Sequence, residues 1–203
     1  MLKKRIAVLV SGNGSNLQAL LNAQKHGVIS SGMIVLVVSD RPGAYALKRA
    51  KEAGVKTSLI DKKAAGRQEF EAQLQKLLAA ESIDLIVLAG FLSILSADFT
   101  RRYEKRIINI HPALIPSFSG SGYYGLKVHE EALKRGVKIS GATVHFVNEI
   151  TDGGEIIAQQ AVAVHPNDTP QTLQQRIMEQ AEWILLPQAV EKVCREINDS
   201  INR

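Results

Sequence analysis

The residues of this chain best suited to chemistry are an amide and an imidazole two positions apart, in the stretch Asn109-Ile110-His111-Pro112. This stretch closes an apolar run that is typical of a buried strand, and the proline stops the strand. Because side chains alternate between the faces of a strand, Asn109 and His111 should point the same way. An amide and a protonated imidazole can both donate hydrogen bonds to an oxyanion, so the pair predicts acyl-transfer chemistry.

A carboxylate that could complete this site lies in the turn Thr151-Asp152-Gly153-Gly154. Most Asp-Gly-Gly sequences are only turns, so Asp152 gains its interest from a partner. Close to His111, it would raise the pKa of the imidazole and keep it protonated at neutral pH. It could also accept a proton from an attacking amine. Asn109, His111 and Asp152 therefore predict an acyl-transfer site without a serine or cysteine nucleophile.

A second motif, Ser11-Gly12-Asn13-Gly14-Ser15-Asn16, lies between the first expected strand and the first expected helix. Small residues there let backbone amides approach an anion at the helix N-terminus. The motif lacks the Gly-Lys-Ser/Thr of a Walker loop, and Leu17 fills the third glycine position of the dinucleotide fingerprint. Asp40 stands where a ribose-binding acid would, so a dinucleotide site stays an alternative. The loop itself favours phosphate binding over a dinucleotide site and over a purely structural turn.

The remaining histidines and the single cysteine offer little for a metal. Cys194 alone excludes an internal disulfide and a cysteine-based zinc site. A histidine site would need several residues from separate elements to converge, namely His26, His129, His145 and His165. We therefore expect no metal.

Composition places the chain among ordinary globular proteins, with 45% hydrophobic and 22% charged residues in 203. The net charge of +5 fits an anionic ligand or plain solubility. Scattered basic residues and 5% aromatics argue against nucleic acid as a partner. No apolar stretch reaches membrane-spanning length, and the apolar start is too short for a signal peptide. A cytoplasmic location is expected.

The first half of the chain alternates apolar runs with amphipathic stretches. Strands are expected near 5–10, 33–38, 55–60, 84–89 and 106–110, and helices near 15–25, 44–53 and 67–80. This alternation predicts an α/β fold, a doubly wound and mostly parallel sheet with helices on both faces.

After a loop at 112–126 and a short helix near 127–135, the pattern changes. Two longer strands, 139–147 and 155–164, flank the Asp152 turn and predict an antiparallel C-terminal addition. Asp168-Thr169-Pro170 opens the last helix, which Pro187 should kink or divide. No linker interrupts residues 1–203, so one domain is expected.

Several motifs together resemble the phosphoribosylglycinamide formyltransferases, folate-dependent enzymes of purine biosynthesis with a Rossmann-like fold. The resemblance covers essentially the whole chain. The motifs are Ser11-Gly12-Asn13-Gly14-Ser15-Asn16-Leu17, Leu88-Ala89-Gly90-Phe91, Asn109-Ile110-His111-Pro112-Ala113-Leu114-Ile115-Pro116 and Val144-His145-Phe146-Val147 followed by Asp152-Gly153-Gly154. The Asn-x-His-Pro pattern with a later Asp is shared with other formyltransferases, whereas the Gly-Asn-Gly-Ser-Asn loop suits an acceptor that carries a phosphate.

The resemblance implies a role for each motif. Asn109 and His111 would polarise the formyl group of 10-formyltetrahydrofolate, the co-substrate, and stabilise its tetrahedral intermediate, while Asp152 keeps His111 protonated and moves the proton off the amine. The phosphate of glycinamide ribonucleotide would be held by Gly14, Ser15 and Asn16, with Glu182 as a further acceptor contact. The folate would contact Arg67, Leu92, Ser93, Ile94, Leu95, Asn109, Asn148, Glu149, Ile150, Thr151 and Asp152.

Two departures from the family pattern stand out. Position 93 is Ser where some relatives carry Arg, and Glu182-Trp183 replaces Glu-His with a spacing from Arg176 that is one residue longer. Residues 117–126 are interpreted as a mobile lid or as a plain surface loop. Residues 1–105 would form the phosphate- and acceptor-binding half and 106–203 the folate-binding and catalytic half, in a monomer or homodimer.

Three rival functions remain. Formyltetrahydrofolate hydrolase would use the same residues with water as the acceptor, but the phosphate loop and the lack of an extra N-terminal regulatory domain argue against it. A nicotinamide-dependent oxidoreductase would use Gly12, Gly14 and Asp40. A phosphoribosyl-ligand sensor would keep the fold without catalysis.

Overall fold

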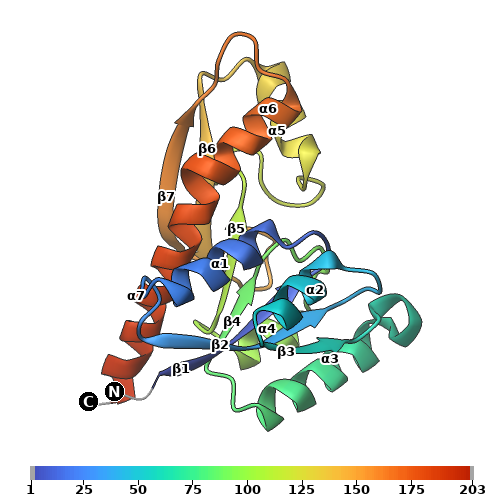
Figure 1. Cartoon of the computed structure of the whole chain (residues 1–203). Coiled ribbons are helices and arrows are strands. Elements are labelled where there is room, and N and C mark those ends of the chain that lie inside the picture. The colour runs from blue at the N-terminus through green and yellow to red at the C-terminus, as the bar shows by residue number, and fades with distance from the viewer. Residues whose placement is uncertain (1–2, 202–203) are drawn as a thin grey trace.

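The computed structural model describes residues 3–201, and its strands form one seven-stranded sheet (Figure 1). The strand order is β3-β2-β1-β4-β5-β6-β7. The first five strands run parallel, whereas β6 and β7 are antiparallel to their neighbours. Their bounds are β1 Lys4–Val10, β2 Gly32–Ser39, β3 Lys56–Leu59, β4 Leu85–Leu88, β5 Ile107–His111, β6 Ile139–Phe146 and β7 Ile156–Ala163. The expected doubly wound sheet with an antiparallel addition is confirmed.

Helices cover both faces of the sheet. Alternate residues of β1 enter two separate cores, because successive side chains of a strand point to opposite faces. Ile6 and Val8 pack in the core that α1 and α7 close, and Ala7 and Leu9 pack in the core under α3. The helices are α1 Ser15–Lys25, α2 Tyr45–Glu52, α3 Lys62–Ala80, α4 Ala97–Arg102, α5 Leu126–Arg135, α6 Pro170–Ile177 and α7 Trp183–Ile201.

Two helical features differ from the sequence-based expectation. The short helix α4 was not expected, although Ser96 caps it by accepting a hydrogen bond from the amide of Phe99. Helix α3 begins earlier than residue 67 because Asp61 caps two amides of its first turn. The turn then breaks at Gly66, whose φ is +75°.

The last helix is divided, and the division lies before Pro187 instead of at it. Pro187 lies inside α7, and the irregular part is the π-helical turn η1, Met178–Glu182, that precedes it. A proline ring crowds the carbonyl four residues earlier and leaves it without a helical partner. That carbonyl belongs to Trp183, directly after η1, so the wider turn lies where the proline disturbs the helix.

The fold gathers the chemistry-bearing segments at the carboxyl ends of the parallel strands, where open α/β sheets place their ligands. The glycine loop follows β1, and Asn109 and His111 lie in the last part of β5. The start of β1 and the end of α7 lie together at the opposite side of the molecule, where N and C are marked in Figure 1.

Candidate active site

The antiparallel pairing of β5 with β6 places two residues of β5 opposite two residues of β6. In this register Asn109 faces His145, and His111 faces Thr143. The Asn109 amide nitrogen lies 3.2 Å from Nε2 of His145. As expected from strand alternation, Asn109 and His111 border the same cavity.

His111 is held between two acceptors. Its Nδ1 lies 3.4 Å from Oδ2 of Asp152, and its Nε2 lies 2.8 Å from the carbonyl oxygen of Phe118. Only 4% of the residue is exposed. Burial lowers the pKa of His111 below its usual value, although Asp152 and the Phe118 carbonyl act in the opposite direction. Asp152 raises the pKa of His111, as expected, but removal from water outweighs the carboxylate, so the net shift is opposite to the one expected.

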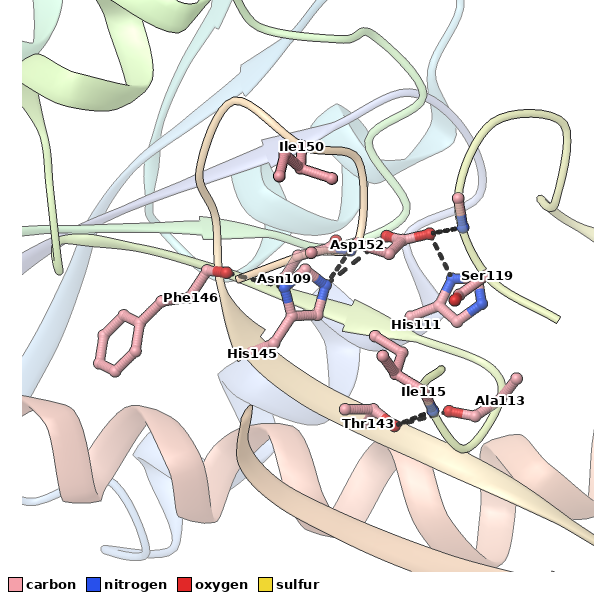
Figure 2. A network of polar contacts seen from close by, with 12 residues as sticks. Asn109, His111, Ala113, Ile115, Ser119, Thr143, His145, Phe146, Ile150 and Asp152 are labelled. Carbon is pink, nitrogen blue, oxygen red and sulfur yellow. Dashed lines mark hydrogen bonds and ion pairs between the residues drawn. The ribbon is translucent and has the colours of Figure 1, made fainter. Parts of the chain in front are cut away.

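Asp152 reaches both histidines from a tight turn. Its backbone has φ +55°, and Gly154 follows where any Cβ would overlap the carbonyl of Phe146. Its Oδ2 faces His111 and accepts a hydrogen bond from the Gly120 amide at 2.9 Å, while Oδ1 lies 3.6 Å from Nε2 of His145. The Asp-Gly-Gly sequence thus serves the turn and the site together (Figure 2).

The pKa of Asp152 reflects these contacts. Burial raises it, but the two imidazoles and the Gly120 amide together lower it below its ordinary value. Asp152 is therefore ionised at neutral pH and can stabilise a positive charge on His111 or accept a proton. The contacts of Phe118 and Gly120 also fasten the 117–126 loop against the two residues.

The glycine loop prepares the N-terminus of α1 for an anion. Gly14 precedes the helix with φ +75°, and a Cβ there would lie 2.6 Å from Cβ of Ala46, so only glycine fits. No side chain caps the helix, and its first turn has no acidic residue. The first amides of α1, beginning at Ser15 and Asn16, therefore point toward a place where a phosphate would be stabilised.

Glu182 joins this end of the site from the last turn of η1. Its Oε2 accepts a hydrogen bond from Nδ2 of Asn16 at 2.6 Å, and burial raises the pKa of Glu182 despite that bond. The π-helical turn also brings Met178 against Ser15, with a distance of 3.9 Å between Sδ of Met178 and Oγ of Ser15. The residues between Arg176 and Glu182 thus include a widened turn at the site, as is common for π-bulges.

A cavity of about 820 Å³ joins the two ends of the site. The structure brings most of the expected site residues to its wall: Ser15, Asn16, Leu92, Ser93, Ile94, Leu95, Asn109, His111, Asn148, Glu149, Ile150, Thr151, Asp152 and Glu182. Gly14 adjoins this wall at the start of α1, but it does not itself line the cavity. Arg67 is exposed on α3 and is not part of the wall either.

Sequence reasoning missed several residues that border the cavity, among them Arg41, His129 and Met178. Arg41 follows β2 next to Asp40, and its position after a parallel strand was the available signal. Asp40 itself is buried and accepts a hydrogen bond from Ser93 Oγ at 2.6 Å. It is directed at the 92–95 segment rather than the cavity, which leaves a ribose-binding role for Asp40 without support.

The middle of the cavity has an apolar wall. Leu92, Ile94 and Ile150 line it and are each more than half exposed, with values of 51%, 59% and 62%. Asn148 shapes the segment that carries Ile150, because its Oδ1 accepts from the Ile150 amide at 3.0 Å. A flat apolar ring could therefore lie between these two segments, next to Asn109.

Residues 3–201 contain no cluster of three histidine, cysteine or acidic residues arranged for a metal ion. Within the same residues, none of the helices combines the length and hydrophobicity needed to cross a bilayer.

Known proteins share this architecture. The trifunctional purine biosynthetic protein adenosine-3 of Gallus gallus is 45% identical over 193 residues, which are 95% of this chain but only 18% of that protein. The chloroplastic phosphoribosylglycinamide formyltransferase of Arabidopsis thaliana is 37% identical over 96% of this chain and 66% of its own length. The crystal structure of glycinamide ribonucleotide transformylase 1 from Symbiobacterium toebii has a TM-score of 0.88 at 40% identity, with 96% of this chain and 89% of that chain covered.

The family match covers residues 4–190, which include the glycine loop, the Asn109 and His111 strand, the Asp152 turn and η1. This match and the shared fold show that the chain belongs to the formyl transferase family.

Proposed function

We propose that the protein transfers the formyl group of 10-formyltetrahydrofolate to the amine of glycinamide ribonucleotide. The observation that carries this proposal is the single cavity with an anion-binding helix terminus at one end and the Asn109, His111 and Asp152 cluster at the other. A phosphate bound at the first end would place an amine near the second. The relatives named for the same reaction support this choice of substrates.

The proposed reaction needs no covalent bond to the protein. The amine nitrogen attacks the formyl carbon, a carbon–nitrogen bond forms, and negative charge develops on the formyl oxygen. Asn109 donates to that oxygen through its amide, and His111 through Nε2, which would exchange the Phe118 carbonyl for the substrate. Positioning of the two substrates supplies much of the remaining rate enhancement.

Asp152 would complete the transfer. Its ionised carboxylate takes up the proton that the amine loses, directly or through water. The same proton then passes to N10, directly or through His111, whose transient positive charge Asp152 stabilises. The bond between the formyl carbon and N10 breaks as N10 becomes protonated, and Asp152 is ionised again. Tetrahydrofolate and the formylated ribonucleotide leave, so atoms and charge balance.

The binding roles are assigned by place. The amides of Ser15 and Asn16, with Gly14 behind them, would hold the phosphate, and Glu182 would contact the ribonucleotide beside Asn16. The apolar segment Leu92, Ser93, Ile94 and Leu95 and the turn Asn148, Glu149, Ile150 and Thr151 would hold the folate ring. Arg67 would reach the folate only from outside the cavity wall.

The deciding experiment mixes purified protein with 10-formyltetrahydrofolate, with and without glycinamide ribonucleotide, and follows tetrahydrofolate release. Release that requires the ribonucleotide, with an equal amount of formylated product, is expected. Release with water alone would indicate the hydrolase. No release would contradict both, and binding of the ribonucleotide without turnover would then favour a sensor. His111→Ala is the matched inactive control.

The cytoplasmic location and the monomeric or homodimeric state stay predictions. So does the division of one domain into an acceptor-binding half, residues 1–105, and a folate-binding and catalytic half, residues 106–203. Size-exclusion chromatography with light scattering of the purified chain measures the oligomeric state directly.

A further inference from the structure

His145 lies at the centre of the polar network in Figure 2, between Asn109 and Asp152. It is only 1% exposed, although the roles proposed above leave it unused. Two polar contacts and one close approach surround its ring: the carbonyl of Phe146, the amide of Asn109 and the carboxylate of Asp152. Their chemistry decides which ring nitrogen carries the hydrogen.

The Phe146 carbonyl fixes the tautomer of His145. Its oxygen lies 2.8 Å from Nδ1 of the ring. A carbonyl oxygen only accepts hydrogen bonds, so Nδ1 must carry the hydrogen that it donates. Oδ1 of Asp152 lies 3.6 Å from Nε2, beyond hydrogen-bond distance, and so does not require a hydrogen there. In the neutral ring, Nε2 then has no hydrogen and acts as an acceptor.

This acceptor orients the Asn109 side chain. Nε2 of His145 and Nδ2 of Asn109 are 3.2 Å apart, and an acceptor on the ring requires a donor on the amide. The amide nitrogen, rather than the amide oxygen, is therefore turned toward His145. That nitrogen has a second hydrogen, which remains for another acceptor in the cavity that Asn109 borders.

We propose that His145 is a positioning residue for formyl transfer, which holds the Asn109 amide with its nitrogen toward the reacting oxygen. This inference rests on the proposed function, because it assigns Asn109 as an oxyanion donor. Without the ring acceptor, the amide can rotate by half a turn and present its oxygen to the oxyanion. A donor would become a repelling acceptor, while the binding surfaces for both substrates stay intact.

Two substitutions at this position separate orientation from packing. His145→Phe keeps a planar ring without an acceptor, whereas His145→Gln can place its side-chain oxygen near the position of Nε2. We expect His145→Phe to lower kcat by up to about 100-fold with both KM values nearly unchanged, as for a small misplacement of a catalytic group. His145→Gln should recover most of kcat. Urea unfolding of both variants verifies the fold.

A double-mutant cycle tests whether the effect passes through Asn109. In an Asn109→Ala background, His145→Phe should cost little more, since the group that it positions is already absent. Full additivity of the two losses would overturn the proposal. So would a kcat for His145→Phe within about twofold of wild type, a change well below that expected for a lost orienting contact, or a folded His145→Gln variant as slow as His145→Phe.

A spectroscopic readout is independent of turnover. Long-range proton–nitrogen correlation spectra of the 15N-labelled protein should show His145 with hydrogen on Nδ1, and the hydrogen on Nε2 would overturn the inference. If the wild type releases no tetrahydrofolate with the ribonucleotide, the proposed function fails and the catalytic role with it, whatever the tautomer. If the wild type is active and His145→Phe equally so, the positioning role alone fails.

Discussion

The carboxylate of Glu182 and the amide of Asn16 meet at 2.6 Å, although 166 positions separate them in the chain. Burial raises the pKa of Glu182 and thereby disfavours its charged form. Glu182→Gln should therefore stabilise the fold at neutral pH by about 1 kcal/mol, as removal of unfavourable buried charge often does. The same change should raise KM for glycinamide ribonucleotide about tenfold, because a charged acceptor is lost.

Urea unfolding and steady-state kinetics measure these two effects of Glu182→Gln on one preparation. A less stable variant with an unchanged KM would show that the carboxylate serves the fold and not the acceptor.

Asp152→Asn should lower kcat by about 10²- to 10⁴-fold, the usual range for loss of a general acid–base group. The fold should survive, because Asn tolerates the positive φ of this position and its amide oxygen can accept from Gly120. Single-turnover kinetics measures the loss of catalytic rate, and the midpoint of urea unfolding measures whether the fold survives. Turnover close to wild type would remove Asp152 from the mechanism.

The burial of His129 predicts that the protein loses stability in mild acid. The ring is fully buried, neither nitrogen has a hydrogen-bond partner among the described residues, and burial lowers its pKa to about 4. Between the unfolded value of 6.5 and this value, the unfolded chain takes up a proton that the folded protein does not. The free energy of unfolding should therefore fall as pH drops through this window, by up to about 3 kcal/mol.

Urea unfolding at a series of pH values between 7 and 4 measures this slope in wild type and in His129→Leu. The variant should show the smaller dependence on pH. Parallel curves for the two proteins would contradict the assignment.

The hydrogen bonds of Glu191 predict that the free energy of unfolding also falls in stronger acid. It accepts hydrogen bonds from the amides of Ser30 and Ser31 at 2.8 and 2.9 Å and from Arg195 at 2.7 Å. Although burial acts to raise the pKa of Glu191, these bonds lower it to about 2. Glu191 contributes to the free energy of unfolding at pH values above 4.5, the pKa of a glutamate in the unfolded chain. This contribution is lost as pH falls toward 2, since the unfolded chain binds the proton first.

Glu191→Gln should lower the free energy of unfolding at pH 7 by about 1–3 kcal/mol, and by less at low pH. Glu196→Gln on the same helix is the control, because its exposed pair with Lys192 should contribute less than about 1 kcal/mol. Equal effects of the two substitutions in urea unfolding would refute this role.

The parallel strands, the antiparallel addition and the convergence of Asn109, His111 and Asp152 could be predicted from the sequence. Hydrophobic period and turn residues are local signals, and the carboxyl ends of parallel strands meet by topology. The direction in which the pKa of His111 shifts could not be predicted, because it depends on how much water the packed loop removes. The role of His145 could not either, since it depends on the register that sets Asn109 opposite it.

The η1 turn and Arg67 show the same limit. The sequence does not say whether the residues before Glu182 continue the helix, kink it or widen it into a bulge. Arg67 has a suitable charge and lies on an expected helix, yet only the orientation of that helix places it outside the cavity wall.

The beginning of β1 and the end of α7 lie together, away from the catalytic cavity (Figure 1). A fold with this geometry is modular: a polypeptide fused at either end need not cross the substrate entrance or disturb the loops that shape it. In the Gallus gallus relative, a trifunctional purine biosynthetic protein, the matching stretch is 18% of a much longer chain.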